Sequence, residues 1–105
     1  MDVTENQLHE VTNACAKIFI QHHLTIAVAE SCTGGMLANT LTNISGSSNY
    51  FKAGIVAYEN QAKIQLIGVN HKTIHKYGAV SDETAKEMAM GVKKIMKSDI
   101  GVGIT

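Results

Sequence analysis

The chain has 105 residues, 45% of them hydrophobic, which indicates one small domain with its own core. Nine basic and nine acidic side chains give a formal net charge of zero, without the basic excess of a protein that binds nucleic acid. All nine basic residues are lysines, so an anion would have to be held by backbone N–H groups, hydroxyls and lysines rather than by a guanidinium fork.

The first half of the chain predicts a helix, a strand and a second helix. Thr4 and Gln7 have the form of a capping box, and apolar residues at helical spacing then predict a helix over 5–22. This apolar series is Leu8, Val11, Cys15, Ile18 and Phe19. The short apolar run 24–29 predicts a buried strand, the pattern over 36–44 a helix, and the polar run 45–49 a loop.

The second half predicts a strand over 53–58, a helix with Asn60 as its N-cap that is closed by Gly68, and a short helix over 72–76. Ser81 then caps a longer helix with acidic residues at its start and lysines near its end. Its expected buried stripe is Ala85, Met88, Ala89, Val92 and Ile95. The run 100–105 predicts a last strand. Alternation of strands and helices predicts a layered α/β domain.

The polar turn between the first strand and the second helix is the first candidate site. It contains Ser31, Cys32, Thr33, Gly34 and Gly35. A turn of this kind directs N–H groups and hydroxyls to one point beside a positive helix end, which suits a phosphate or a developing oxyanion. The alternative is that the glycines serve only to bend the chain. Glu30, just before the turn, could act as a base or could accept hydrogen bonds from nearby N–H groups.

Ser48, Tyr58 and Lys63 form the second candidate site. A lysine in the first turn of a helix faces the positive dipole end, and burial further disfavours its charged form, so both effects lower its pKa. A neutral Lys63 could activate a serine hydroxyl, with Tyr58 orienting the amine or relaying a proton. A strand of about 20 Å separates Ser48 from Lys63, so the two meet only if the loop folds back or another chain supplies one of them. The alternative is an exposed Lys63 and a Ser48 that only forms a turn.

The cysteines and histidines do not predict a metal site or a disulfide framework. We expect Cys15 to be a small core residue and Cys32 to be packed rather than reactive. His71 and His75 are four residues apart, but we expect no metal there. No signal peptide or membrane-length apolar run is predicted, so we expect a cytoplasmic protein without a membrane partner.

From about residue 26 onward the chain resembles the nicotinamide mononucleotide deamidase family, also found as the C-terminal domain of CinA, the competence/damage-inducible protein. The matching segments are 29–35 (AESCTGG), 44–48 (ISGSS), 54–58 (GIVAY), 60–63 (NQAK), 66–69 (LIGV) and 78–81 (GAVS).

The resemblance implies a three-layer α/β/α fold over 1–105 and hydrolysis of nicotinamide mononucleotide to nicotinic acid mononucleotide and ammonia, a step of pyridine nucleotide recycling. It implies a Ser–Lys mechanism without a metal or cofactor. The nucleophile falls on Ser48, the base on Lys63 and the supporting tyrosine on Tyr58. The substrate-binding positions are Ser31, Thr33, Gly34, Gly35 and Thr105. It also implies a homo-oligomer.

The family continues past this last strand with a Gly-rich loop and an arginine suited to substrate phosphate, and neither is found in these 105 residues. We therefore expect a truncated domain. The alternative function is a non-catalytic module that binds a nucleotide or a protein, or that pairs through its last strand.

Overall fold

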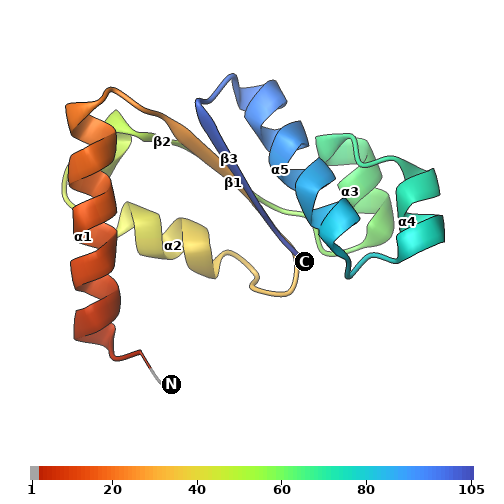
Figure 1. Ribbon diagram of the computed structural model, residues 1–105, viewed down its shortest axis with the longest axis horizontal. Coiled ribbons are helices and arrows are strands. Elements are labelled where there is room, and N and C mark those ends of the chain that lie inside the picture. The colour runs from red at the N-terminus through yellow and green to blue at the C-terminus, as the bar shows by residue number, and fades with distance from the viewer. Residues whose placement is uncertain (1–2) are drawn as a thin grey trace.

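The computed structural model describes residues 3–105, and helices alternate with strands along them (Figure 1). In chain order the elements are α1 (Glu5–Gln21), β1 (Ile26–Glu30), α2 (Met36–Thr42), the 3-10 helix η1 (Ser47–Asn49), β2 (Phe51–Val56), α3 (Asn60–Ile67), α4 (His71–Tyr77), α5 (Asp82–Met96) and β3 (Ile100–Ile104). The predicted α/β class and the predicted helices and strands are confirmed, with ends displaced by a few residues.

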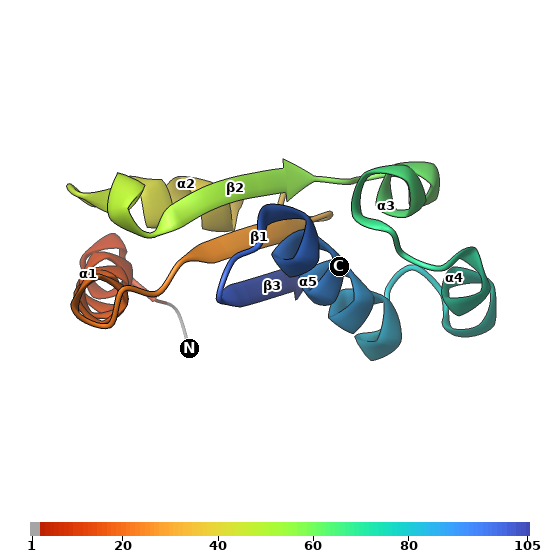
Figure 2. The same cartoon turned by 90° about the horizontal axis from the view of Figure 1, so that it is seen from above.

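The three strands form a parallel sheet in the order β2-β1-β3. In the register of this sheet Glu30 lies opposite both Val56 and Ile104, so the carboxyl ends of all three strands meet at one edge. Helices cover both faces of the sheet: α1 and α2 lie on one side, and α3, α4 and α5 lie on the other (Figures 1 and 2). The predicted three-layer α/β/α arrangement is therefore confirmed.

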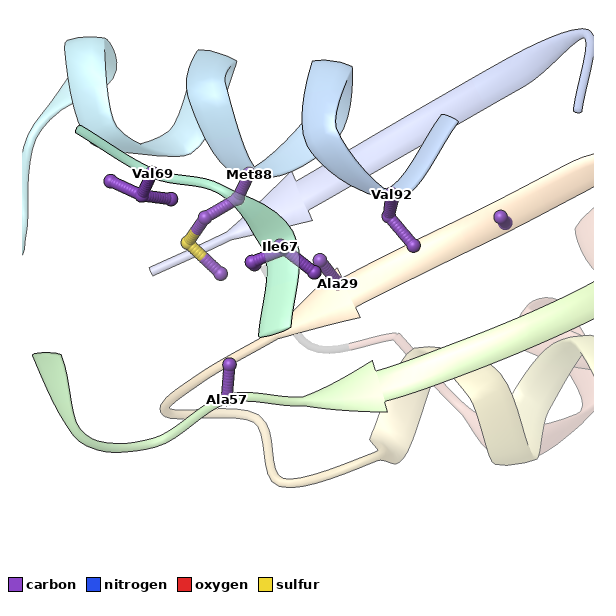
Figure 3. Close-up of a cluster of buried hydrophobic side chains, with 7 residues drawn as sticks. Ala29, Ala57, Ile67, Val69, Met88 and Val92 are labelled. Atoms are coloured by element: carbon purple, nitrogen blue, oxygen red, sulfur yellow. The ribbon is translucent and has the colours of Figure 1, made fainter. Parts of the chain in front are cut away.

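The core is divided between the two faces of the sheet because side chains of β1 alternate between them. Ala29 faces α5 and the segment at the end of α3 (Figure 3), and Ala27 belongs to the same cluster. The core on this side contains Ala57, Ile67, Val69, Met88 and Val92. Ile26 and Val28 face the other side, where Ala16, Leu41, Ile44 and Tyr50 complete the second cluster. All five residues of β1 are buried, as expected for the central strand of a three-layer fold.

The apolar faces of two helices differ from the prediction. In α1 the buried residues are Thr12 and Ala16, whereas Val11 is 61% and Ile18 52% exposed. Helical spacing predicts that a helix has an apolar face but does not say which neighbour covers it, and α1 lies at one end of the molecule beside α2 (Figure 2). In α5 the stripe is buried at Met88 and Val92, but Ile95, near the end of the helix, is half exposed.

Three local predictions are also corrected. The N-cap of α3 is Glu59, not Asn60, which is the first residue of the helix. Cys32 is exposed rather than packed, and Cys15 is only partly buried.

Within residues 3–105, no helix combines the length and the apolar character needed to cross a lipid bilayer.

Replacement of Gly91 by alanine tests how closely α5 approaches the end of α3. An added Cβ would lie 1.9 Å from the Ile67 carbonyl oxygen, a backbone atom that cannot move aside alone. A glycine-to-alanine change inside a helix normally stabilises by about 0.5–1 kcal/mol. We expect the overlap to outweigh that gain, so that Gly91→Ala lowers the free energy of unfolding by about 1–3 kcal/mol in urea denaturation. Met90→Ala, at an exposed neighbouring position, is the control.

Candidate functional site at the carboxyl edge of the sheet

The candidate site lies where the path of the chain reverses across the sheet. From β1 the chain passes over one face to β2, and it then crosses the other face to β3 on the opposite side of β1. Such a reversal leaves a crevice outside the carboxyl ends of the central strands, which is where ligands bind in open parallel sheets. Ser31 follows β1 directly at this point, and its N–H donates to the carbonyl of Ile104 at the end of β3.

A buried lysine amine lies at this edge. Lys63, in α3, is only 1% exposed, and its Nζ donates to the Ser31 hydroxyl at 3.0 Å and to the Tyr58 carbonyl oxygen at 2.7 Å. The Ser31 hydroxyl is also 3.4 Å from that carbonyl oxygen. Amine, hydroxyl and carbonyl thus form a compact cluster from three different segments. Burial lowers the pKa of Lys63 below its ordinary value because it disfavours the charged amine, and the nearby Cys32 opposes this effect.

The turn that carries Ser31 is tied to the helix after it by a second buried group. The Glu30 carboxylate is 1% exposed and accepts hydrogen bonds from the Thr33 hydroxyl at 2.6 Å and from the N–H groups of Leu37 and Ala38 at 3.0 and 2.9 Å. Burial on its own raises the pKa of Glu30, but these hydrogen bonds together outweigh it and hold the pKa below the ordinary value. Of the two roles considered for Glu30, the structure shows the hydrogen-bonding one.

The glycines of this turn serve its shape. Gly34 and Gly35 have φ angles of 60° and 105°, a left-handed conformation that other residues adopt only at a cost. They let the chain reverse between the end of β1 and the first turn of α2, where the Gly34 N–H donates to the Ser31 carbonyl. The predicted strand–turn–helix geometry is confirmed, but the two helix N–H groups named above already bind Glu30, so they are not available to a substrate phosphate.

Ser48 lies away from this cluster. It is an exposed residue of η1, before the start of β2, whereas Lys63 follows the end of that strand. The six residues of β2 separate the two ends by about 20 Å at 3.3 Å per residue. The loop therefore does not fold back, and one chain does not bring Ser48 and Lys63 together. Of the two routes considered for this pair, only a contribution from another chain remains.

The other predicted residues lie at the same edge as Lys63. Tyr58 contributes its backbone carbonyl to the cluster, while its side chain is 72% exposed. The Thr105 hydroxyl donates to the carbonyl of Ala79, in the loop before α5, and its chain neighbour Ile104 accepts from Ser31. Among residues 3–105 no group of three or more His, Cys, Asp or Glu side chains is arranged to hold a metal ion.

The pairing of Ser31 with Lys63 was missed in the sequence, although both residues were singled out. The signal was present: Ser31 follows the central strand and Lys63 follows its neighbour β2, and parallel strands place their carboxyl ends together. By the same rule a residue that precedes β2, such as Ser48, belongs at the opposite edge.

Comparison with known proteins agrees with this geometry. The CinA C-terminal domain family matches residues 8–105. A putative competence-damage inducible protein of Acetivibrio thermocellus is 50% identical over 96 residues, which is 91% of this chain and 23% of that protein. The solved competence/damage inducible protein of Agrobacterium tumefaciens is 36% identical with a TM-score of 0.88, over 94% of this chain and 60% of that one. A CinA superfamily protein of Escherichia coli gives 31% identity and a TM-score of 0.87, over 94% and 58%. The chain thus spans less than a quarter of the curated relative and about three fifths of these solved structures.

Replacement of Lys63 by methionine tests the buried amine. Because the pKa of Lys63 is lowered in the folded state, the unfolded chain holds more protons between that lowered value and the ordinary 10.5, and the free energy of unfolding rises with pH in this interval. Lys63→Met has no titrating amine at this position, so it lacks this pH-dependent contribution to the free energy of unfolding. Its side chain keeps an apolar stem of similar length. We expect the variant to be more stable than the parent at neutral pH, and its advantage to shrink as the pH rises toward 10.5. Urea denaturation of both proteins across this range measures the difference; an advantage that is constant with pH would contradict the lowered pKa.

Proposed function

The chain belongs to the CinA C-terminal domain family, and we propose that it is an amidohydrolase that converts nicotinamide mononucleotide to nicotinic acid mononucleotide and ammonia. The observation that supports this proposal is the contact between a buried lysine amine and a serine hydroxyl, Lys63 Nζ to Ser31 Oγ at 3.0 Å. Buried amines of lowered pKa are found where a lysine serves as a base rather than as a surface charge.

The proposed reaction needs only groups at this edge of the sheet. Neutral Lys63 takes the proton of the serine hydroxyl as the oxygen attacks the carboxamide carbon. The ammonium so formed gives this proton to the departing amine, and ammonia leaves. Water then attacks the acyl-enzyme ester, and Lys63 accepts one proton from the water and returns it to the serine oxygen as the ester bond breaks. The product leaves as the carboxylic acid and passes its remaining proton through solvent to the released ammonia. Backbone N–H groups of the turn that bind neither Glu30 nor Ser31 would stabilise the oxyanion.

Two serines are candidates for the nucleophile. The family resemblance points to Ser48, which would have to come from a neighbouring chain of a homo-oligomer. Contact within one chain favours Ser31, which among residues 3–105 is the serine that hydrogen-bonds the Lys63 amine. We propose Ser31 as the nucleophile. Tyr58 then acts through its carbonyl, which holds the amine in place.

The substrate part of the proposal rests on the family resemblance and on the character of the site. The reacting group of nicotinamide mononucleotide is a neutral carboxamide, so a neutral amine can approach it without a charge penalty. Thr105, Thr33 and the exposed side chain of Tyr58 lie at the same edge and are the proposed substrate contacts. A module that binds a nucleotide or a protein without turnover is the second candidate.

Alanine variants of the two serines separate these proposals. We expect Ser31→Ala to lower the rate of ammonia release from nicotinamide mononucleotide by about 10³-fold or more, the scale on which loss of a nucleophile acts. Ser48→Ala, at an exposed position of η1, should keep a rate close to that of the parent. Ammonia is followed by a coupled assay, and ligand binding by calorimetry with the same protein.

The other possible outcomes decide which serine is the nucleophile and whether the chain is an amidohydrolase. If Ser48→Ala abolishes turnover and Ser31→Ala does not, the nucleophile is Ser48 of a neighbouring chain, and our assignment is wrong. If the parent protein binds the nucleotide and releases no ammonia, the amidohydrolase proposal is wrong and the binding module stands. Lys63→Met should match Ser31→Ala, because either change removes one half of the pair.

A further inference from the structure

We infer that Glu30 is a positioning residue of the site: it serves as a built-in anion for the start of α2 and thereby keeps the Ser31 hydroxyl at the Lys63 amine. The effect on turnover rests on the function proposed above, but the effect on the geometry does not. Glu30 touches neither the amine nor the hydroxyl, and it acts through the turn that it closes.

The contacts of Glu30 join three consecutive parts of the chain. Its backbone ends β1, its Oε1 accepts from the Thr33 hydroxyl and the Leu37 N–H, and its Oε2 accepts from the Ala38 N–H. Ser31 lies between the first and the second of these attachments. The turn is thus fixed before and after Ser31, which leaves its hydroxyl little freedom to move from the amine.

A carboxylate suits this place better than a neutral side chain does. The unpaired N–H groups at the start of a helix carry partial positive charge, and α2 has no side-chain cap of its own on Gly35. From inside the protein, Glu30 supplies one carboxylate oxygen to the Leu37 N–H and the other to the Ala38 N–H. Because the carboxylate is 1% exposed, it binds there without competition from water or dissolved anions.

The amide of a glutamine cannot replace these contacts. In Glu30→Gln the side-chain shape is kept, but one oxygen becomes an NH2 group that faces an N–H or hydroxyl donor. At least one hydrogen bond is lost, and two donors are brought together in a buried place. The turn must shift to relieve this contact, and Ser31 shifts with it.

The test compares Glu30→Gln with the parent in two measurements. Because a displacement of about 1 Å at a reacting group costs up to about 100-fold in rate, we expect kcat for ammonia release to fall by about 10- to 100-fold, with KM changed by less than about threefold. In the second measurement, the carbon resonance of the Lys63 Cε is titrated with pH in lysine-labelled protein. We expect its midpoint to lie below the ordinary 10.5 of a lysine in the parent and to move toward that value in Glu30→Gln.

Glu87→Gln is the matched control. Glu87 is also a carboxylate that closes a helix start: it accepts from the Asn70 N–H and from the Thr73 hydroxyl at α4. Loss of its charge should lower stability in the same way, but it should leave kcat and the Lys63 midpoint as in the parent. Thr33→Val is a milder second variant, because it removes one bond to Glu30 and keeps the carboxylate. Because Thr33 is also a proposed substrate contact, the informative readout for this variant is the Lys63 midpoint, which we expect to move in the same direction by a smaller amount.

The outcomes distinguish the two proposals. An unchanged kcat and an unchanged Lys63 midpoint in both Glu30→Gln and Thr33→Val would overturn the positioning role. Equal losses of kcat in Glu30→Gln and Glu87→Gln would also overturn it, since general destabilisation would then explain the effect. If the parent releases no ammonia, the proposed function fails, while a Lys63 midpoint that moves in Glu30→Gln and not in Glu87→Gln still supports the role of Glu30.

Discussion

The removal of one lysine amine from water is the constraint on which the site depends. A charged amine loses its hydration when it is buried, and a neutral amine loses far less, so the fold favours the form that can accept a proton. Lys63 reaches this place because α3 begins immediately beyond the carboxyl end of β2, beside the turn that follows β1. The Tyr58 carbonyl and the Ser31 hydroxyl then satisfy its hydrogen bonds. The chemistry available here therefore follows from strand order.

Much of this fold could be predicted because its signals are local. The capping box at Thr4 and the N-cap at Ser81 each need only neighbouring residues, and both are present. The faces of the helices were less predictable. Val11 and Ile18 have helical spacing, but their exposure depends on where α1 lies relative to the sheet, which no local pattern contains. The same limit explains why the serine partner of Lys63 was not predicted. Ser31 and Ser48 are both turn residues in sequence, and only the parallel register places Ser31 at the edge of the sheet where Lys63 lies.

The turn after β1 shows how one pattern can serve two purposes. Glycines and hydroxyls before a helix suggest a place for an external anion. Here the acidic residue just before the turn fills that role from within, and no spacing rule distinguishes a carboxylate that folds back from one that points to solvent. The distinction rests on burial: Glu30 ends a central strand with both faces covered, so its side chain must find partners nearby. Because Glu30 occupies these N–H groups, they do not bind external anions, and the geometry of the turn is fixed.

The hydrogen bond from the Lys63 amine to a main-chain carbonyl has a consequence for which residues can be substituted at position 58. Lys63 is anchored at position 58 by a carbonyl oxygen, which every amino acid possesses, whereas the phenol ring at that position extends into solvent. The side chain at this position can therefore be exchanged without removing the hydrogen bond that holds the Lys63 amine. Under the proposed function, a change of side chain at position 58 would alter the contacts to the substrate and leave the hydrogen bonding of the amine as it is.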